Sequence, residues 1–173
     1  MSFTLYDALV PTWQQMLGSM SDLLDKAQVH SAERNLPDST LIEARLADDM
    51  LPLGYQIKSV VLHSVGAIEG VRRGVFSPDR SPWPDSFAGL KQHVSEALAA
   101  LQQIEPAEIN GFLGKDMRFE FGERRLDFTA ENFLLSFSQP NFFFHATTAY
   151  DILRHNGLTI GKRDFMGKTR VKS

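Results

Sequence analysis

The sequence predicts an all-α protein: a four-helix bundle with one small β-hairpin between its third and fourth helices. Four segments repeat apolar residues every three or four positions, a pattern typical of helices that bury one face. Residues 117–129 alternate apolar and charged residues instead, as strands do. No internal repeat, low-complexity tract or linker interrupts the chain, so we expect residues 1–173 to form a single domain with a short basic C-terminal tail.

The first helix is expected to run from Thr4 to about Gln28. Thr4 and Asp7 have the spacing of an N-terminal capping arrangement, with a carboxylate near the positive end of the helix dipole. Pro11 predicts a kink, because proline cannot donate a backbone hydrogen bond. The apolar face of this helix, which we expect to be core, consists of Leu9, Trp13, Met16, Leu17, Met20, Leu23, Leu24 and Ala27.

Two further long helices are predicted in the middle of the chain. Ser39 is expected to cap a short helix that ends at Leu46, and the second long helix follows over residues 53–73. A loop rich in glycine and proline then leads to the third long helix over residues 87–104, which Pro106 ends. Each long helix has apolar residues on one face, so all of them can share a core.

The hairpin is predicted between the third and fourth helices. Met117, Phe119 and Phe121 alternate with charged residues, which would place the three apolar side chains on one face of a strand. The dipeptide Gly122-Glu123 stands between the two alternating halves of this segment. Glycine tolerates the positive φ that tight hairpin turns require, so we expect the turn there.

The last helical region is expected to begin near Thr129 and to continue to His155. Pro140 lies inside this region and predicts a break, because it can neither donate to the preceding turn nor fit against it without strain. At the far end, the dipeptide Asn156-Gly157 supplies a left-handed stop.

Composition limits the classes of function. The formal charge of −3 and the isoelectric point near 5.9 argue against broad binding of nucleic acid or of anionic membranes. The basic residues from Lys162 to Lys172 are expected to form a solvated tail rather than a binding patch. The absence of cysteine excludes disulfides, thiolate zinc sites and a cysteine nucleophile. The N-terminus lacks a signal-peptide pattern, and no apolar run approaches ~20 residues, so a cytoplasmic protein is expected.

The segment from Pro140 to Gly157 carries the candidate site. Asn141 and His145 are four residues apart, so they share one face of the helix with Thr148. His63, on the second long helix, also lies among apolar residues, beside the main apolar stripe. The residues leave two interpretations open for each histidine: an imidazole satisfied by hydrogen bonds within the core, or part of a polar or metal-binding pocket.

The other three histidines are expected to have structural roles. His30 and His93 lie in polar surroundings, which predicts surface positions. His155 lies in the last turn of its helix, where a partly cationic imidazole interacts favourably with the helix dipole. No glycine-rich phosphate loop, serine nucleophile elbow or HExxH zinc motif is present in the sequence.

The segment from Val61 to Gly74 resembles the second helix of the DinB/YfiT-like superfamily, a group of four-helix bundles described as metalloenzymes. This helix of the superfamily carries a histidine, which His63 matches. The last helix of the superfamily carries a His-x-x-x-His pair before an ending similar to Leu153–Gly157. The pair falls on Asn141 and His145, so the second histidine is matched and the first is replaced.

Longer stretches resemble a narrower group, an uncharacterised bacterial branch of this superfamily without an assigned function. The stretches are Ala44–Met50, Pro140–Tyr150 and Gly161–Phe165. They lie far apart in the chain, so the resemblance covers nearly all of it. The fold that this resemblance implies is the four-helix bundle that the periodicity predicts.

The resemblance implies a divalent metal such as Zn²⁺ or Ni²⁺, held by His63 and His145 with Asn141 in the third position. Three neutral imidazoles would leave an open coordination position where a water can be activated. Asn141 offers only an amide oxygen, which suits hard cations better. Asp49 either adds a carboxylate or caps the second long helix. The expected pocket therefore consists of Asp49, Asn141, His145 and Thr148.

Two functions are compared for this site. The first is a bundle with a degenerate or weak metal site and a binding or structural role, in which the same residues form a hydrogen-bond network or a small-molecule pocket. The alternative is a metal-dependent hydrolase or thiol transferase that uses His63 and His145. We favour the first. The run Phe142–Phe144 has more aromatic surface than one helix face buries, so a homodimer is expected alongside the alternative of packing within the monomer.

Overall fold

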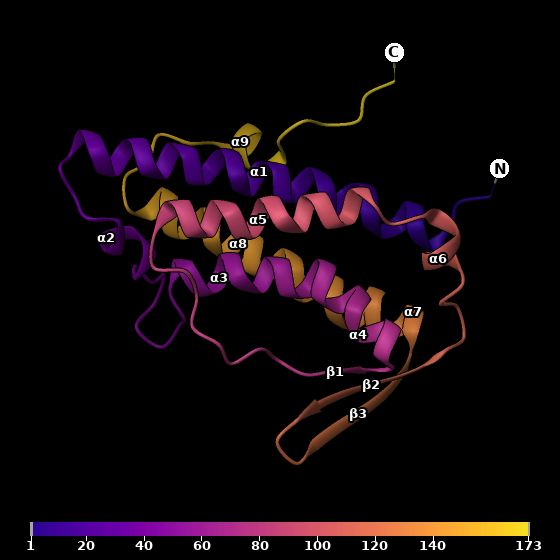
Figure 1. Cartoon of the computed structure of the whole chain (residues 1–173). Helices are drawn as coiled ribbons and strands as arrows, with labels where there is room; N and C mark the ends of the chain where they lie inside the picture. The colour runs from indigo at the N-terminus through magenta and orange to yellow at the C-terminus, as the bar shows by residue number, and fades with distance from the viewer. Residues whose placement is uncertain (1, 173) are drawn as a thin grey trace.

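The structure is a computed structural model that describes residues 2–172. These residues are mostly helical, with one small sheet near one end of the molecule (Figure 1). The helices are α1 (Leu5–Glu33), α2 (Asp38–Ile42), α3 (Leu53–Val61), α4 (Ala67–Arg73), α5 (Phe87–Gln102), α6 (Pro106–Asn110), α7 (Ala130–Asn132), α8 (Gln139–His155) and α9 (Lys162–Met166). Two π-helical turns join helices without a break: η1 (Leu62–Gly66) and η2 (Phe133–Ser138). The strands are β1 (Val75–Phe76), β2 (Asp116–Phe121) and β3 (Arg124–Thr129).

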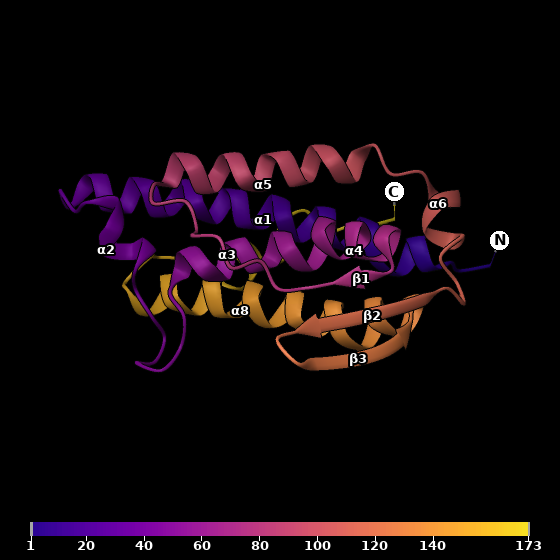
Figure 2. The ribbon, with the colours of Figure 1, turned by 60° about the horizontal axis from the view of Figure 1, so that its bottom comes forward.

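Four long helical segments lie side by side (Figures 1 and 2). They are α1, the continuous run α3–η1–α4, α5, and the continuous run α7–η2–α8. α1 packs against α5, and α3 packs against α8, while further contacts join α3 to α5 and α1 to α8. Because each segment touches at least two others, the apolar faces of all four meet in one interior.

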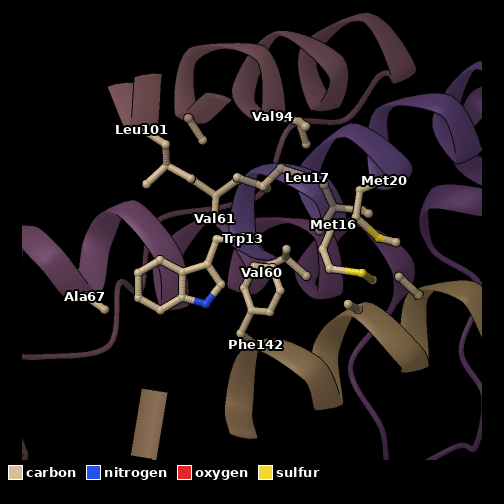
Figure 3. Close-up of a cluster of buried hydrophobic side chains, with 14 of the residues drawn as sticks. Trp13, Met16, Leu17, Met20, Val60, Val61, Ala67, Val94, Leu101 and Phe142 are labelled. Atoms are coloured by element: carbon tan, nitrogen blue, oxygen red, sulfur yellow. The ribbon is translucent and has the colours of Figure 1, made fainter. Parts of the chain in front are cut away.

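The core lies between these segments (Figure 3). Trp13 of α1 and Phe142 of α8 are fully buried, with ring centroids 6.2 Å apart. Val60 of α3 and Val94 of α5 bring the other two segments into the same cluster, and both are fully buried. Every residue of the apolar stripe predicted for α1 is buried, so the sequence prediction of this core face is confirmed.

The start of α1 is the capping box that the sequence predicts. The hydroxyl of Thr4 accepts a hydrogen bond from the backbone N–H of Asp7, and the Asp7 carboxylate accepts one from the N–H of Thr4 at 3.0 Å. These bonds satisfy donors that have no partner within the helix. α1 then continues through Pro11 as one helix.

α1 is longer than predicted. It continues to Glu33 instead of ending near Gln28, so His30 lies within the helix. His30 is buried, so its predicted surface position is wrong. The chain after α8 explains this, because residues 158–160 lie against the last turns of α1 beside His30.

Two short helices also differ from prediction. α2 begins directly after Pro37, not at a cap formed by Ser39, and it ends at Ile42 rather than at Leu46. The third long helix, α5, already ends at Gln102, before Pro106. Pro106 instead begins α6, because proline fits the first turn of a helix, where its missing N–H is not needed.

The sheet has the order β1–β2–β3. β2 and β3 pair antiparallel, with Phe119 opposite Leu126, and Gly122 has a φ of +61° in the turn between them. β1 pairs parallel with β2, where Val75 lies opposite Arg118. The sequence predicted a loop in place of β1, because two residues are too few to show a periodicity and their pairing depends on a partner far along the chain.

The predicted break at Pro140 does not occur. η2 leads directly into α8, and Pro140 lies in the first turn of α8. The π turn before it already departs from the regular i→i−4 bonding that proline would interrupt. At the other end of α8, Gly157 has a φ of +89°, as the left-handed stop requires.

The C-terminal segment lies against α1. α9 packs on α1, and the guanidinium of Arg170 donates to the backbone oxygen of Pro11 and to the side chains of Thr12 and Gln15. Residues 168–172 are exposed, as predicted, but Arg170 makes these contacts as well. Within residues 2–172, no helix combines the length and the apolar character that a membrane span needs.

Candidate functional site

His63 and His145 lie side by side inside the protein. His63 belongs to η1 and is 7% exposed, and His145 belongs to α8 and is 9% exposed. Their rings are stacked, with an interplanar angle of 15° and centroids 5.7 Å apart. Two imidazoles that the chain separates by more than 80 positions are thus brought into one buried pair.

Gln56 of α3 fixes the proton of His145. The side-chain Nε2 of Gln56 donates to the backbone oxygen of Leu51 at 2.7 Å, so its Oε1 is the atom that faces His145. This Oε1 lies 2.7 Å from Nδ1 of His145. Since an amide oxygen can only accept, Nδ1 carries the proton, and Nε2 of His145 keeps its lone pair.

Ser138 has the same relation to His63. The hydroxyl of Ser138, at the end of η2, donates to the backbone oxygen of His63 at 3.0 Å. Its proton is therefore used, and the oxygen faces Nδ1 of His63 at 3.3 Å as an acceptor. This longer contact also favours the Nδ1–H form, which leaves the lone pair of His63 on Nε2.

Both imidazoles are held neutral. Burial lowers the pKa of His63 to about 3, and the neighbouring His145 lowers it in the same direction. Burial lowers the pKa of His145 to about 4. Removal from water penalises the charged form of each ring, so both pKa values lie well below the ordinary value of about 6.5. At neutral pH the pair therefore presents hydrogen-bond acceptors and not cations.

Both π turns lie at this pair. η1 contains His63, and η2 ends at Ser138, the residue that bonds to His63. A π turn inserts one residue into a helix and shifts the side chains that follow relative to regular α-helical spacing. Such turns are frequent at functional sites, so their position here supports the histidine pair as the site of the protein.

Aromatic rings surround the pair. Phe76 and Phe137 lie beside His63, with ring centroids 5.5 Å and 6.1 Å away. Tyr55 and Phe144 lie beside His145, edge-on, with centroids 5.8 Å and 5.3 Å away. Within residues 2–172, neither histidine makes a salt bridge with a carboxylate. The surroundings are thus apolar and aromatic, apart from the amide and hydroxyl groups that bond to Nδ1.

Asn141 and Thr148 lie on α8 on either side of His145. Asn141 is half-buried, and its Nδ2 donates to the backbone oxygen of Phe137 one turn earlier. One of its two N–H donors is therefore used within its own helix, and the amide oxygen is the group that it could offer to a metal ion. Thr148 is buried one turn after His145.

Asp49 does not have the capping role considered for it. It is exposed in the loop between α2 and α3, and the residue before the first turn of α3 is Pro52, without a side-chain cap. In residues 2–172, no three or more His, Cys, Asp or Glu side chains gather closely enough to hold a metal ion. Asp49 therefore does not complete a cluster with His63 and His145.

The donor set does not fit a three-histidine metal centre. The side chains brought together are two neutral imidazoles, with the amide of Asn141 one turn before His145. Zinc and nickel favour nitrogen and sulfur ligands and are held by three or four of them. In the part of the chain that the structure describes, two imidazoles remain one strong ligand short of the site that the sequence resemblance implies.

Sequence reasoning missed Gln56 and Ser138. Both are buried polar residues, and each lies on a helix face among apolar neighbours. A buried glutamine must find partners for its amide, so its position within an apolar helix was a usable signal. The identity of the partner was not readable, because it depends on how α3 packs against α8.

A family model and a solved structure each match almost the whole chain. A family model described as "Domain of unknown function (DUF1993)" matches residues 5–166. A crystal structure of a DinB family member protein from Shewanella denitrificans is similar, with a TM-score of 0.81 and 26% sequence identity over 98% of this chain and 95% of that chain. No curated protein matches this sequence. The likeness in structure therefore extends over all the elements that form the histidine pair.

Proposed function

We propose that this chain, which belongs to the DUF1993 family and folds like a DinB family member, is a binding protein whose site is the pair of His63 and His145. The proposed scaffold is a four-helix bundle with the β2–β3 hairpin between its third and fourth helices. The proposed site is a degenerate metal site, with Asn141 where the resemblance implies a third histidine. Its ligand is an uncharged molecule, and divalent metals bind only weakly.

The tautomers of the two histidines carry this proposal. Gln56 accepts a hydrogen bond from Nδ1 of His145, and Ser138 accepts one from Nδ1 of His63. The Nε2 atom of each histidine therefore keeps a lone pair that can accept a hydrogen bond. The low pKa values of both rings keep these lone pairs free at neutral pH. A ligand with N–H or O–H donors and an apolar body matches two acceptors among aromatic rings, whereas a carboxylate or phosphate does not.

A metal titration tests the proposed degenerate site. Zn²⁺ or Ni²⁺ is added to tag-free, metal-free protein while the ring signals of His63 and His145 are followed by NMR. We expect weak binding by the wild-type protein and none by His145→Ala. Asn141→His restores a third imidazole one turn before His145 and should tighten binding, because each added nitrogen ligand favours these metals. Tight stoichiometric binding by the wild-type protein would contradict a degenerate site.

The alternative function is a metal-dependent hydrolase or thiol transferase that uses His63 and His145. The hydrogen bonds at Nδ1 favour it, because metal-binding histidines usually donate their other ring N–H to an oxygen of the protein. Elemental analysis of protein purified without tag or chelator separates the two functions. Near-stoichiometric metal that is lost in His145→Ala would support the enzyme and justify assays of hydrolysis and thiol transfer.

A further inference from the structure

The loop between β1 and α5 lies along α3, next to the histidine pair. In Figure 1 this loop leaves the sheet and passes alongside α3 before α5 begins. It meets α3 at Gly54 and Lys58, which are one helical turn apart and therefore share a face of α3. Tyr55 and Gln56, which both contact His145, lie between these attachment points.

The first attachment is the indole ring of Trp83. The ring lies so close to the backbone of α3 that a methyl group at position 54 would overlap it, which explains the glycine there. Its Nε1 donates to a carboxylate oxygen of Glu43 at 2.9 Å. The hydrogen bond and the close packing together leave Trp83 little freedom on this face of α3.

The second attachment is the buried ammonium group of Lys58. It donates to the backbone oxygens of Asp79 and Ser81, and it pairs with the carboxylate of Asp79 at 3.0 Å. The three N–H donors of Lys58 are all used, which offsets the cost of burying its charge. The loop is therefore fixed at Trp83 and, just before it, at Asp79 and Ser81.

Trp83 reaches the histidine pair through Tyr55. The rings of Trp83 and Tyr55 meet edge-on with centroids 6.1 Å apart, and Tyr55 meets His145 edge-on at 5.8 Å. Tyr55 is half-buried and lies between the loop and the imidazole. An aromatic chain of three rings thus runs from the loop to the candidate site.

We propose that Trp83 is a positioning residue of the site: it holds Tyr55 over His145 and thereby controls access to the imidazole. This role rests on the proposed site at His63 and His145 and assigns to it a loop residue that reaches His145 through Tyr55. Without the indole ring, Tyr55 loses its support on one side and can turn away from His145. The loop would then govern how readily a ligand reaches the Nε2 lone pair.

The test measures acylation of each histidine by diethyl pyrocarbonate, with mass spectrometry to separate the sites. The lone pair of a neutral imidazole attacks a carbonyl carbon of this reagent, and ethyl carbonate leaves. His155 is exposed and sets the reference rate. His30 is as buried as His145, at 9% exposure, and lies in the last turn of α1 beside residues 158–160, so it is a matched control. In Trp83→Ala we expect the rate at His145 to rise about two- to twelvefold against His155, the factor that corresponds to one lost aromatic pair. The rate at His30 should stay unchanged.

Two further variants sharpen the test. Gly54→Ala should reproduce the effect by displacing Trp83, although alanine is the better helix former. Arg80→Ala removes an exposed side chain of the same loop and should leave His145 protected. An unchanged rate at His145 in folded Trp83→Ala, or an equal rise at His145 and His30, would overturn the positioning role. Either result would leave the metal titration, and with it the proposed binding function, unaffected.

Discussion

Gln56 and His145 lie 89 positions apart in the chain, yet Oε1 of Gln56 is 2.7 Å from Nδ1 of His145. The bond from Gln56 to the oxygen of Leu51 prevents the amide from presenting its nitrogen to the ring. One side chain on α3 therefore decides which nitrogen of His145 keeps a lone pair. The chemistry of the candidate site is set by a residue outside the pair itself.

Gln56→Leu should remove this control. The variant leaves the buried Nδ1–H of His145 without an acceptor, so we expect the free energy of unfolding to fall by about 1–3 kcal/mol. Urea denaturation measures the loss, and ¹⁵N NMR of His145 should show a mixture of tautomers in place of one. Gln92→Leu is the matched control, since Gln92 is exposed on α5, and its effect should stay within about 0.5 kcal/mol. A single persistent Nδ1–H form in Gln56→Leu would contradict the role of Gln56.

Stability should fall as the solution is acidified below the ordinary pKa of histidine. The pKa values of about 3 for His63 and about 4 for His145 lie below that of an unfolded histidine. The unfolded chain therefore binds more protons between about pH 6.5 and pH 4, and each histidine lowers the free energy of unfolding by about 1.4 kcal/mol per pH unit there.

His145→Leu separates this effect from that of the carboxylates. Removing the buried imidazole of His145 should reduce the slope between about pH 6.5 and pH 4 by the share of that one group, about 1.4 kcal/mol per pH unit. Urea denaturation at several pH values gives both slopes. Identical slopes for the variant and the wild-type protein would mean that His145 is not held neutral by burial.

Gly157→Ala should destabilise the end of α8. Gly157 has a φ of +89°, and an L-residue in a left-handed conformation costs roughly 1–2 kcal/mol. Gly161→Ala is the control, because Gly161 has an extended backbone and open space where a Cβ would stand. Thermal unfolding should show a lower midpoint for Gly157→Ala alone, and an equal drop in both variants would refute the conformational explanation.

Phe142→Ala and Phe144→Ala should differ strongly in stability although only Phe143 separates the two residues on α8. Phe142 is fully buried against Trp13, so its truncation leaves a cavity and should cost about 3–5 kcal/mol. Phe144 is 56% exposed, and its truncation should cost far less. Chemical denaturation measures both. Similar losses would mean that Phe144 is covered in solution.

Such a cover could be a second copy of the chain, and we keep the homodimer as a prediction. An exposed aromatic ring beside the candidate site favours association, because it gains when removed from water. Sedimentation equilibrium should show a dimer that Phe144→Ser weakens. Phe3→Ser is the control, since Phe3 is 79% exposed near the N-terminus. A monomeric wild-type protein at high concentration would end this prediction.

The long helices were predictable because their signals are local. The three- and four-residue spacing of the α1 stripe, the pair Thr4 and Asp7, and the stop at Gly157 each act within a few residues of chain. The end of α1 was not predictable from local signals, because the turns of α1 after Gln28 are covered by the C-terminal segment. Contacts from distant parts of the chain decided that end.

The bonds that shape the candidate site were beyond a reading of the sequence. His63, Asn141 and His145 could be selected by residue type and spacing, yet Gln56 and Ser138 meet them only through packing of separate segments. The π turns also left no periodic signal, since one inserted residue hardly changes an apolar pattern. For the same reason Pro140 looked like a break in the helix, although the chain continues through it.

The parallel pairing of β1 with β2 has a consequence for the order in which the protein folds. β1 directly follows α4, whereas β2 comes only after α5 and α6, so the two strands meet across a long stretch of chain. Closing that stretch in an unfolded chain is entropically unfavourable, while docking of the helices shortens the path between the strands. We therefore expect the β2–β3 hairpin to form from its own neighbours, and β1 to join it late, after the helices have assembled.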